Sequence, residues 1–104
     1  MSIFTDFIGI YCLIRSKDAG VFAGTLIEVE GGNARIQNAR RLWKWKGASS
    51  LSELSQKGVL HPESCMFPCE VPEILVLGII EVIPCSTKAI DSIASVPEWS
   101  SHCP

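Results

Sequence analysis

Residues 21–45, VFAGTLIEVEGGNARIQNARRLWKW, contain the pattern that decides the fold. Polar and apolar side chains alternate towards residue 30, as they do in a β-strand with one buried face. The turn sequence Gly-Gly-Asn, which begins at Gly31, tolerates the positive φ angles of a tight hairpin. The pattern therefore predicts one strand over residues 21–30 and a return strand over residues 34–45. Because the return strand is unusually long, we expect a β-bulge near Asn38.

Two other stretches have the composition of buried strands. Residues 7–15 (FIGIYCLIR) and 74–83 (ILVLGIIEVI) are rich in β-branched and aromatic side chains and lack a helical period. The second stretch includes the longest apolar run of the chain, so we expect it to form the most buried strand. Together with the hairpin, these segments predict a sheet of about four strands.

Two short helices are expected in the second half of the chain. Ser50 and Glu53 have the spacing of a capping box, and Gly58 supplies a left-handed stop. These residues predict a helix over residues 50–57. Residues 86–96 begin with side chains that can cap a helix and place apolar residues on one face, which predicts a second helix.

This order of elements predicts one α+β domain over residues 1–104, with a small antiparallel or mixed sheet and the helices on one face. The chain has 104 residues, 47% of them hydrophobic and 19% charged, which suffices for one core. Two short helices leave one sheet face poorly covered, so we expect a homo-oligomer in which a second copy buries it. No apolar run reaches the length of a membrane span, so we expect no membrane partner.

Positive charge is concentrated in the middle of the chain. The formal net charge is -2, from 9 basic and 11 acidic side chains, which argues against a general nucleic-acid-coating protein. Residues 31–52 nevertheless contain basic side chains and no acidic one. The basic residues of this segment are Arg35, Arg40, Arg41, Lys44 and Lys46.

The basic segment also contains two tryptophans and leads into the first predicted helix. Guanidinium groups match phosphate oxygens bidentately, indole faces stack on bases, and the free N–H groups of a helix start favour an anion. Strict alternation places Arg35, Arg41 and both tryptophans on one strand face, whereas a bulge would exchange the positions of Arg40 and Arg41. We therefore predict a nucleotide-phosphate site. Its residues are Arg35, Arg40, Arg41, Trp43, Trp45, Lys46, Gly47, Ser49 and Ser50.

A purely structural interpretation of the same segment also fits. A basic exposed strand can be a sheet edge that uses charge to avoid aggregation, with its tryptophans packed on the core or on an oligomer contact.

The cysteines and histidines do not form a convincing chemical site. The five cysteines are an odd number, which we interpret as reduced cytosolic thiols, with Cys12 and Cys85 acting as small core residues. His61, Cys65 and Cys69, with Cys85 or Cys103 as a fourth ligand, have poor spacing for zinc, so we expect no metal site. His61 and His102 lie in predicted loops, and no nucleophile turn or phosphate loop is present. We expect a protein that is not an enzyme and needs no cofactor.

Three stretches carry a resemblance to a known group of proteins. They are YCLIRSKDAGVFAGTL (11–26), NARRLWKWKGASSLSEL (38–54) and FPCEVPEILVLGIIEVIPCSTKA (67–89). Together they resemble an uncharacterised family of small accessory proteins from tailed phages and their prophages. The resemblance implies a protein that acts in the host bacterial cytoplasm.

By functional analogy, small oligomeric phage proteins bind and sequester nucleotide immune signals without cleaving them. The expected function is therefore sequestration of a cyclic oligonucleotide or a cyclic ADP-ribose derivative as an anti-defence protein. Two alternatives stay open. One is a module that inhibits or recruits a host protein through exposed tryptophans, and the other is a weak binder of single-stranded nucleic acid.

Overall fold

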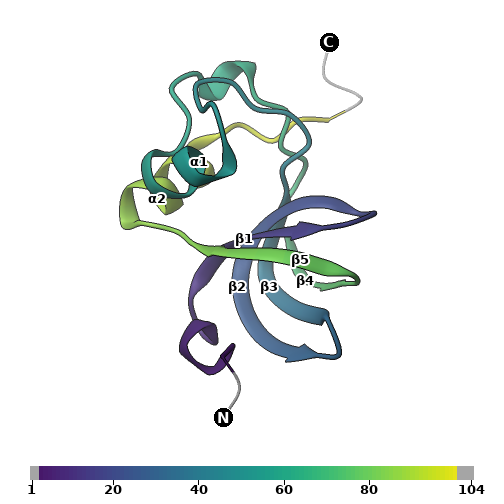
Figure 1. Ribbon diagram of the computed structural model, residues 1–104. Helices are drawn as coiled ribbons and strands as arrows, with labels where there is room; N and C mark the ends of the chain where they lie inside the picture. The colour runs from purple at the N-terminus through teal and green to yellow at the C-terminus, as the bar shows by residue number, and fades with distance from the viewer. Residues whose placement is uncertain (1–2, 101–104) are drawn as a thin grey trace.

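Five antiparallel strands and two helices form an α+β fold in the computed structural model, which describes residues 3–100 (Figure 1). The strands are β1 (Tyr11–Ser16), β2 (Gly20–Glu30), β3 (Asn33–Arg41), β4 (Val71–Val76) and β5 (Ile79–Pro84). The helices are α1 (Leu51–Lys57) and α2 (Thr87–Ser95), and single 3-10 turns cover Thr5–Phe7 and Pro62–Ser64. Both helices lie beyond one end of the strongly bent sheet.

The strand order is β4-β3-β2-β1-β5, so the last two strands form opposite ends of the sheet although they are consecutive in the chain. Only Leu77 and Gly78 separate them, which requires the sheet to curl until its two ends approach each other. The N–H of Ile79 donates to the carbonyl of Gly32 over 2.8 Å, which ties this turn to the tip of the β2–β3 hairpin.

The two faces of the curled sheet contact different apolar clusters. The inner cluster fills the concave side and consists of Cys12, Ile14, Phe22, Leu26, Ala34, Ile36, Ala39 and Val76. The outer cluster lies between the sheet and the helices and consists of Leu13, Ala23, Leu42, Leu54, Val59, Cys65, Phe67, Ile93 and Val96. Successive residues of β1 alternate between the two clusters, as the strand period requires.

Both predicted helices are confirmed. Ser50 accepts a hydrogen bond from the N–H of Glu53 over 3.2 Å, and α1 stops at Gly58, which has a positive φ of 75°. Ser86 caps α2 through the N–H of Ala89 over 3.1 Å. The α+β class is therefore confirmed, and the antiparallel alternative is the one that forms.

The predicted strand over residues 74–83 is wrong, because this run divides into β4 and β5 and the sheet has five strands instead of about four. Gly78, with a φ of 68°, donates to the side-chain oxygen of Asn33, and the hydroxyl of Ser16 donates to the carbonyl of Leu77 over 2.6 Å. These side chains from distant segments hold the turn. The run is also not the most buried, since both of its strands lie at sheet ends and are partly exposed.

Two other strand boundaries differ from expectation. The strand predicted over residues 7–15 begins only at Tyr11, because a 3-10 turn ends at Phe7. The strand predicted over residues 34–45 ends at Arg41. The expected bulge is confirmed: Asn38 has a φ of 51°, and the pairing with β2 shifts beside it.

Candidate functional site

The segment that follows β3 leaves the sheet but keeps a strand-like course. The N–H of Leu42 still donates to the carbonyl of Val21 over 2.9 Å. Lys44 then pairs with Met66 in an isolated antiparallel bridge. These contacts fix the backbone that carries the two tryptophans. Trp43 is 65% exposed, whereas Trp45 is half-buried against the outer cluster.

A shallow groove of about 280 Å³ lies between this segment and the turn that joins β1 to β2. Its lining residues are Ala19, Gly20, Val21, Arg41, Leu42, Trp43 and Trp45. The structure therefore brings together three of the predicted site residues, one arginine and both tryptophans. The contribution of the β1–β2 turn was not predicted, since nothing in the sequence links that turn to the tryptophans.

The guanidinium of Arg41 is held at the groove by two contacts. One terminal N–H donates to the carbonyl of Ala19 over 2.7 Å, and the carbon of the guanidinium lies 4.5 Å from the centroid of the Phe22 ring. The side chain is otherwise exposed, so most of its N–H groups face solvent. Arg41 is thus oriented by the protein and still has donors for an anion.

Arg40 has the opposite environment, although it is the adjacent residue. It is 7% exposed, and four of its N–H groups point to backbone carbonyls. The accepting residues are Pro68 (2.9 Å), Ile93 (2.9 Å), Phe67 (3.1 Å) and Val96 (2.7 Å). Its burial lowers the pKa of the guanidinium. Arg40 therefore joins α2 and the 67–68 segment to the sheet, and it lies outside the groove that holds Arg41.

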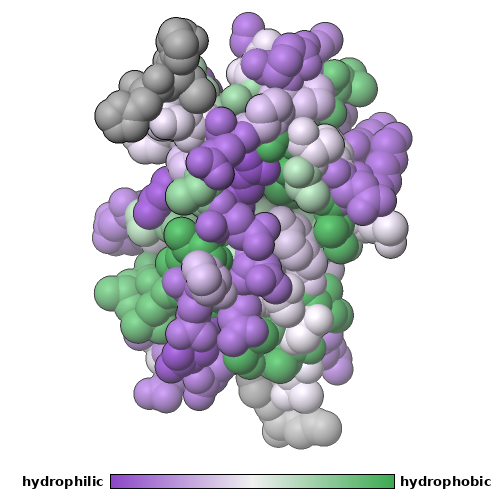
Figure 2. Space-filling view, turned by 180° about the vertical axis from the view of Figure 1, so that it is seen from behind, coloured by the Kyte–Doolittle hydropathy of each residue, from purple (hydrophilic) through white to green (hydrophobic). Residues whose placement is uncertain are grey.

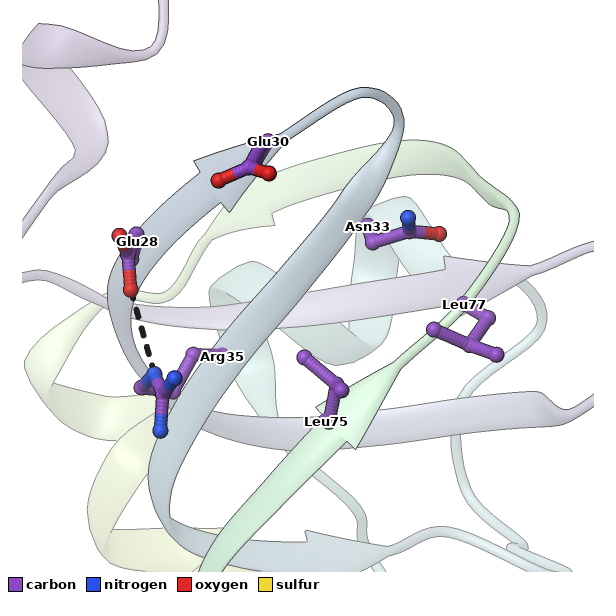
Figure 3. Close-up of a pocket in the computed structure, with 6 residues that line it drawn as sticks. All are labelled: Glu28, Glu30, Asn33, Arg35, Leu75 and Leu77. Atoms are coloured by element: carbon purple, nitrogen blue, oxygen red, sulfur yellow. Dashed lines mark hydrogen bonds and ion pairs between the residues drawn. The ribbon is translucent and has the colours of Figure 1, made fainter.

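Arg35 lies in a different groove, of about 240 Å³, on the outer surface of β2, β3 and β4 (Figure 3). It forms ion pairs with Glu28 over 3.2 Å and with Glu73 over 2.9 Å. The hydrogen bond that Arg35 donates to Glu28, together with the charge of Glu73, raises the pKa of Arg35. Its charge is thus already balanced by carboxylates. Because the bulge at Asn38 shifts the alternation, Arg35 and Arg41 do not share a face.

The start of α1 is occupied by the chain's own carboxylate. Glu53 accepts a hydrogen bond from the N–H of Ser49 over 2.9 Å, one residue before the N–H of Ser50 that a standard capping box would use. Gly47 has a φ of 90°, and a Cβ there would lie 2.3 Å from the backbone nitrogen of Leu60. Gly47, Ser49 and Ser50 therefore form a tight structural junction, and the structure does not bring them into the groove of Arg41.

Lys46 lines a third groove, which shares Trp45 with the groove of Arg41. This groove has a volume of about 450 Å³ and is lined by Lys44, Trp45, Lys46, Glu63, Ser64, Cys65, Met66 and Trp99. Trp99 reaches it because its N–H donates to the carbonyl of Phe67 over 2.9 Å. Trp45 thus lines both this groove and the groove of Arg41. Trp99 is a lining residue that was not predicted from the sequence.

The described cysteines and His61 do not converge on a common site. Within residues 3–100, no group of three or more His, Cys, Asp or Glu side chains could hold a metal ion. Cys12, Cys65, Cys69 and Cys85 are free thiols, while His102 and Cys103 lie outside the described residues. Burial raises the pKa of Cys12 to about 11 and that of Cys85 to about 12, so these two thiols stay protonated at neutral pH.

In the part of the chain that the structure describes, no helix has the length and apolar character needed to cross a membrane.

Comparisons with known proteins identify a family. No curated protein and no solved structure matches the chain. A family model does match residues 9–93, which include all five strands and most of α2. The chain therefore belongs to the family described as a domain of unknown function, DUF6948.

Proposed function

We propose that the protein binds and sequesters a nucleotide in the groove formed by Arg41, Trp43 and Trp45. The observation that carries this proposal is the position of Trp43. This residue is 65% exposed and lies beside the guanidinium of Arg41, which is held by Ala19 and still has N–H groups that face solvent. Tryptophan is enriched among the residues that contribute most to binding, because its large ring provides contact area and its N–H can donate a hydrogen bond. A nucleotide offers both a flat base and an anionic phosphate, so it matches the pair.

The two kinds of contact have similar strengths and recognise different parts of a nucleotide. The guanidinium of Arg41 would take a phosphate oxygen in a charge-assisted hydrogen bond, which is worth roughly 1.5 to 3 kcal/mol. Stacking on the indole of Trp43 would add roughly 1 to 3 kcal/mol for each base. Together they would support tight binding only if both engage the same ligand, which makes both residues necessary.

Sequestration without cleavage fits the chemistry of the groove. Among the described residues that line it, none carries a carboxylate, an imidazole or a thiol. A group that could act as a general base is therefore missing from the lining. The biological role that we propose is an anti-defence protein of a tailed phage, which removes a nucleotide immune signal from the host bacterial cytoplasm.

We propose further that the protein works as a homo-oligomer. Leu75, Leu77 and Ile80 are 63%, 58% and 56% exposed, and they lie in and around the turn that joins β4 to β5, where Figure 2 shows an apolar patch. A second copy that covered this patch would bury apolar surface that now faces water. Sedimentation at micromolar concentration should show a species larger than 11.4 kDa, and a pure monomer would contradict this part of the proposal.

Retention followed by mass spectrometry tests the nucleotide proposal. The protein is mixed with cyclic dinucleotides, cyclic trinucleotides and ADP-ribose derivatives, filtered, and then denatured. We expect one ligand class to be retained and then released with unchanged mass. Arg41→Ala and Trp43→Ala should each reduce retention strongly, whereas Arg15→Ala, at an exposed arginine outside the groove, should not. Failure to retain any nucleotide, or release of a cleaved product, would refute the proposal.

The openness of the same groove favours a second candidate function. A shallow surface with one prominent tryptophan is also typical of a protein-binding site, in which that side chain is the anchor. A protein-binding module would retain no nucleotide in the filtration experiment, and Trp43→Ala would instead abolish capture of a host protein.

A further inference from the structure

A fourth cavity, separate from the groove of Arg41, lies between α2 and the outer face of the sheet. Its volume is about 430 Å³, which is within the range of small-molecule sites. One wall is apolar and comes from α2 and the residues after it, chiefly Ile90, Ile93, Ala94 and Val96. The rest of the lining, called the polar wall below, consists of polar side chains.

The polar wall collects side chains from five separate segments of the chain. They are Tyr11 from β1, Thr25 from β2, Asn38 from the bulge in β3, Glu70 from the segment before β4, and Glu98 from the segment after α2. None of these five side chains makes a hydrogen bond or an ion pair to another residue in the described range 3–100. Such a convergence of unpaired polar groups is typical of a ligand site.

The charge balance of the cavity indicates the sign of the ligand. Arg40 is the only cation in the lining, and its N–H groups are already directed to backbone carbonyls. Two carboxylates, Glu70 and Glu98, face this single cation, so one negative charge is left over. Tyr11 is neutral, since burial raises the pKa of its phenol to about 12. An anion would be repelled here, and a cation would be attracted.

We propose that this cavity binds a small organic ammonium ion, whose charged end lies against Glu70 and Glu98 and whose apolar chain lies along α2. An ammonium group has three donors and no acceptor, and this lining offers it acceptors: carboxylates, two hydroxyl oxygens and the amide oxygen of Asn38. The apolar wall of Ile90 and Ala94 accommodates a short alkyl chain. The cavity is independent of the nucleotide groove, because the two have no lining residue in common.

Titration with butylamine tests this inference, with butanol as an uncharged probe of similar size. Binding is followed by the chemical shifts of the backbone amides of Asn38 and of α2. We expect saturable shifts with butylamine below about 10 mM and at least tenfold weaker binding of butanol. Glu70→Gln and Glu98→Gln should each weaken butylamine binding about tenfold, the loss expected for one charge-assisted hydrogen bond.

Asp91→Asn is the matched control, because Asp91 is an exposed acid of α2 that does not line the cavity. It should leave the affinity for butylamine unchanged. The inference is overturned if butanol binds as well as butylamine, if butylamine gives no saturable shifts, or if Asp91→Asn weakens binding as much as Glu98→Gln. The last result would mean that butylamine responds only to the general negative charge of the surface.

Discussion

Arg40 and Arg41 are neighbours in the chain, yet they lie in the two most different environments that a surface strand offers. Arg40 is buried, with four of its N–H groups donating to backbone carbonyls of α2 and of the 67–68 segment. Arg41 makes one such bond, to Ala19, and is otherwise exposed beside Trp43. Adjacent residues of a strand point to opposite faces, so one of the two had to face the helices.

This difference shows that a cluster of like charges need not be one functional unit. The three arginines of residues 31–52 have three different surroundings: the ion pairs of Arg35, the buried contacts of Arg40 and the open groove of Arg41. Of these three, Arg41 is the arginine that is neither paired with a carboxylate nor buried. The composition of the sequence locates the cluster of basic residues, whereas the hydrogen-bond partners of each arginine decide whether it can bind a ligand.

The largest expected effect is on stability, from removal of Arg40. Arg40→Ala leaves four backbone carbonyls without their donor, most of them buried, and should lower the free energy of unfolding by about 3 to 5 kcal/mol. Arg41→Ala removes one exposed hydrogen bond and a ring contact, and should cost less than about 1.5 kcal/mol. Urea unfolding of both variants measures the difference. Equal losses would break the comparison.

Substitution of Gly47 should have the next largest effect on stability, because Gly47 lies in tight contact with the backbone of Leu60. Gly47→Ala forces a Cβ against the backbone of Leu60 at a φ of 90°, and should cost about 2 to 4 kcal/mol. Gly31→Ala is the control, since Gly31 has a φ of 56° but open space around its Cα, and should cost only about 1 to 2 kcal/mol. Thermal unfolding of the two variants should therefore give clearly separated midpoints.

Alkaline pH should destabilise the fold, because acidic groups on both faces of the sheet are shielded from water and keep their protons: Tyr11 and Cys85 beside the outer cluster and Cys12 in the inner cluster. The pKa is raised from 10.0 to about 12 for Tyr11, and from 9.0 to about 11 for Cys12 and about 12 for Cys85. The unfolded chain therefore loses these protons first, so unfolding becomes more favourable as the pH rises above about 9. Urea unfolding between pH 7 and about 11 should show no change from these groups below pH 9 and a decline above it.

Replacing one of these groups checks the cause of the decline. Cys85→Ala removes a titrating thiol, and its free energy of unfolding should fall less steeply with pH than that of the native protein. Identical slopes would show that the buried thiol does not contribute.

The smallest effect on stability is expected from the substitution of Arg35. Its ion pairs with Glu28 and Glu73 are exposed, and exposed pairs contribute roughly 0 to 1 kcal/mol. Arg35→Ala should therefore leave stability nearly unchanged, and it should not alter nucleotide retention, since Arg35 does not line the groove of Arg41. Loss of retention in this variant would show that the site includes both faces of β3.

Local patterns predicted the helices and the central hairpin because their signals lie within a few residues. Ser50 with Glu53 and the Gly-Gly-Asn turn are such signals, and the bulge at Asn38 followed from strand length. The division of residues 74–83 was missed because Ser16 and Asn33, far away in the chain, hold the turn at Gly78. The single Gly78 within an apolar run was the one local signal for it.

The sequence predicted the kinds of side chain in the candidate site, but it did not predict which of the candidate residues belong to it. The sequence places Arg41, Trp43 and Trp45 close together, and they do share a groove. The sequence could not show that Arg40 would donate its hydrogen bonds to backbone carbonyls between residues 67 and 96. Nor could it show that the β1–β2 turn would line the groove of Arg41. Both depend on contacts between segments that only the folded chain brings together.

Calorimetric titration of the native protein and of Arg41→Ala is the most direct test of the nucleotide groove. The ligands are the cyclic dinucleotides, cyclic trinucleotides and ADP-ribose derivatives used for retention, and urea unfolding first establishes that the variant is folded. We predict that one class binds the native protein with a Kd below about 10 μM and that Arg41→Ala weakens its binding about tenfold or more. Absence of such binding to the native protein, or equally tight binding to folded Arg41→Ala, would contradict the proposal that Arg41 holds the phosphate of a nucleotide.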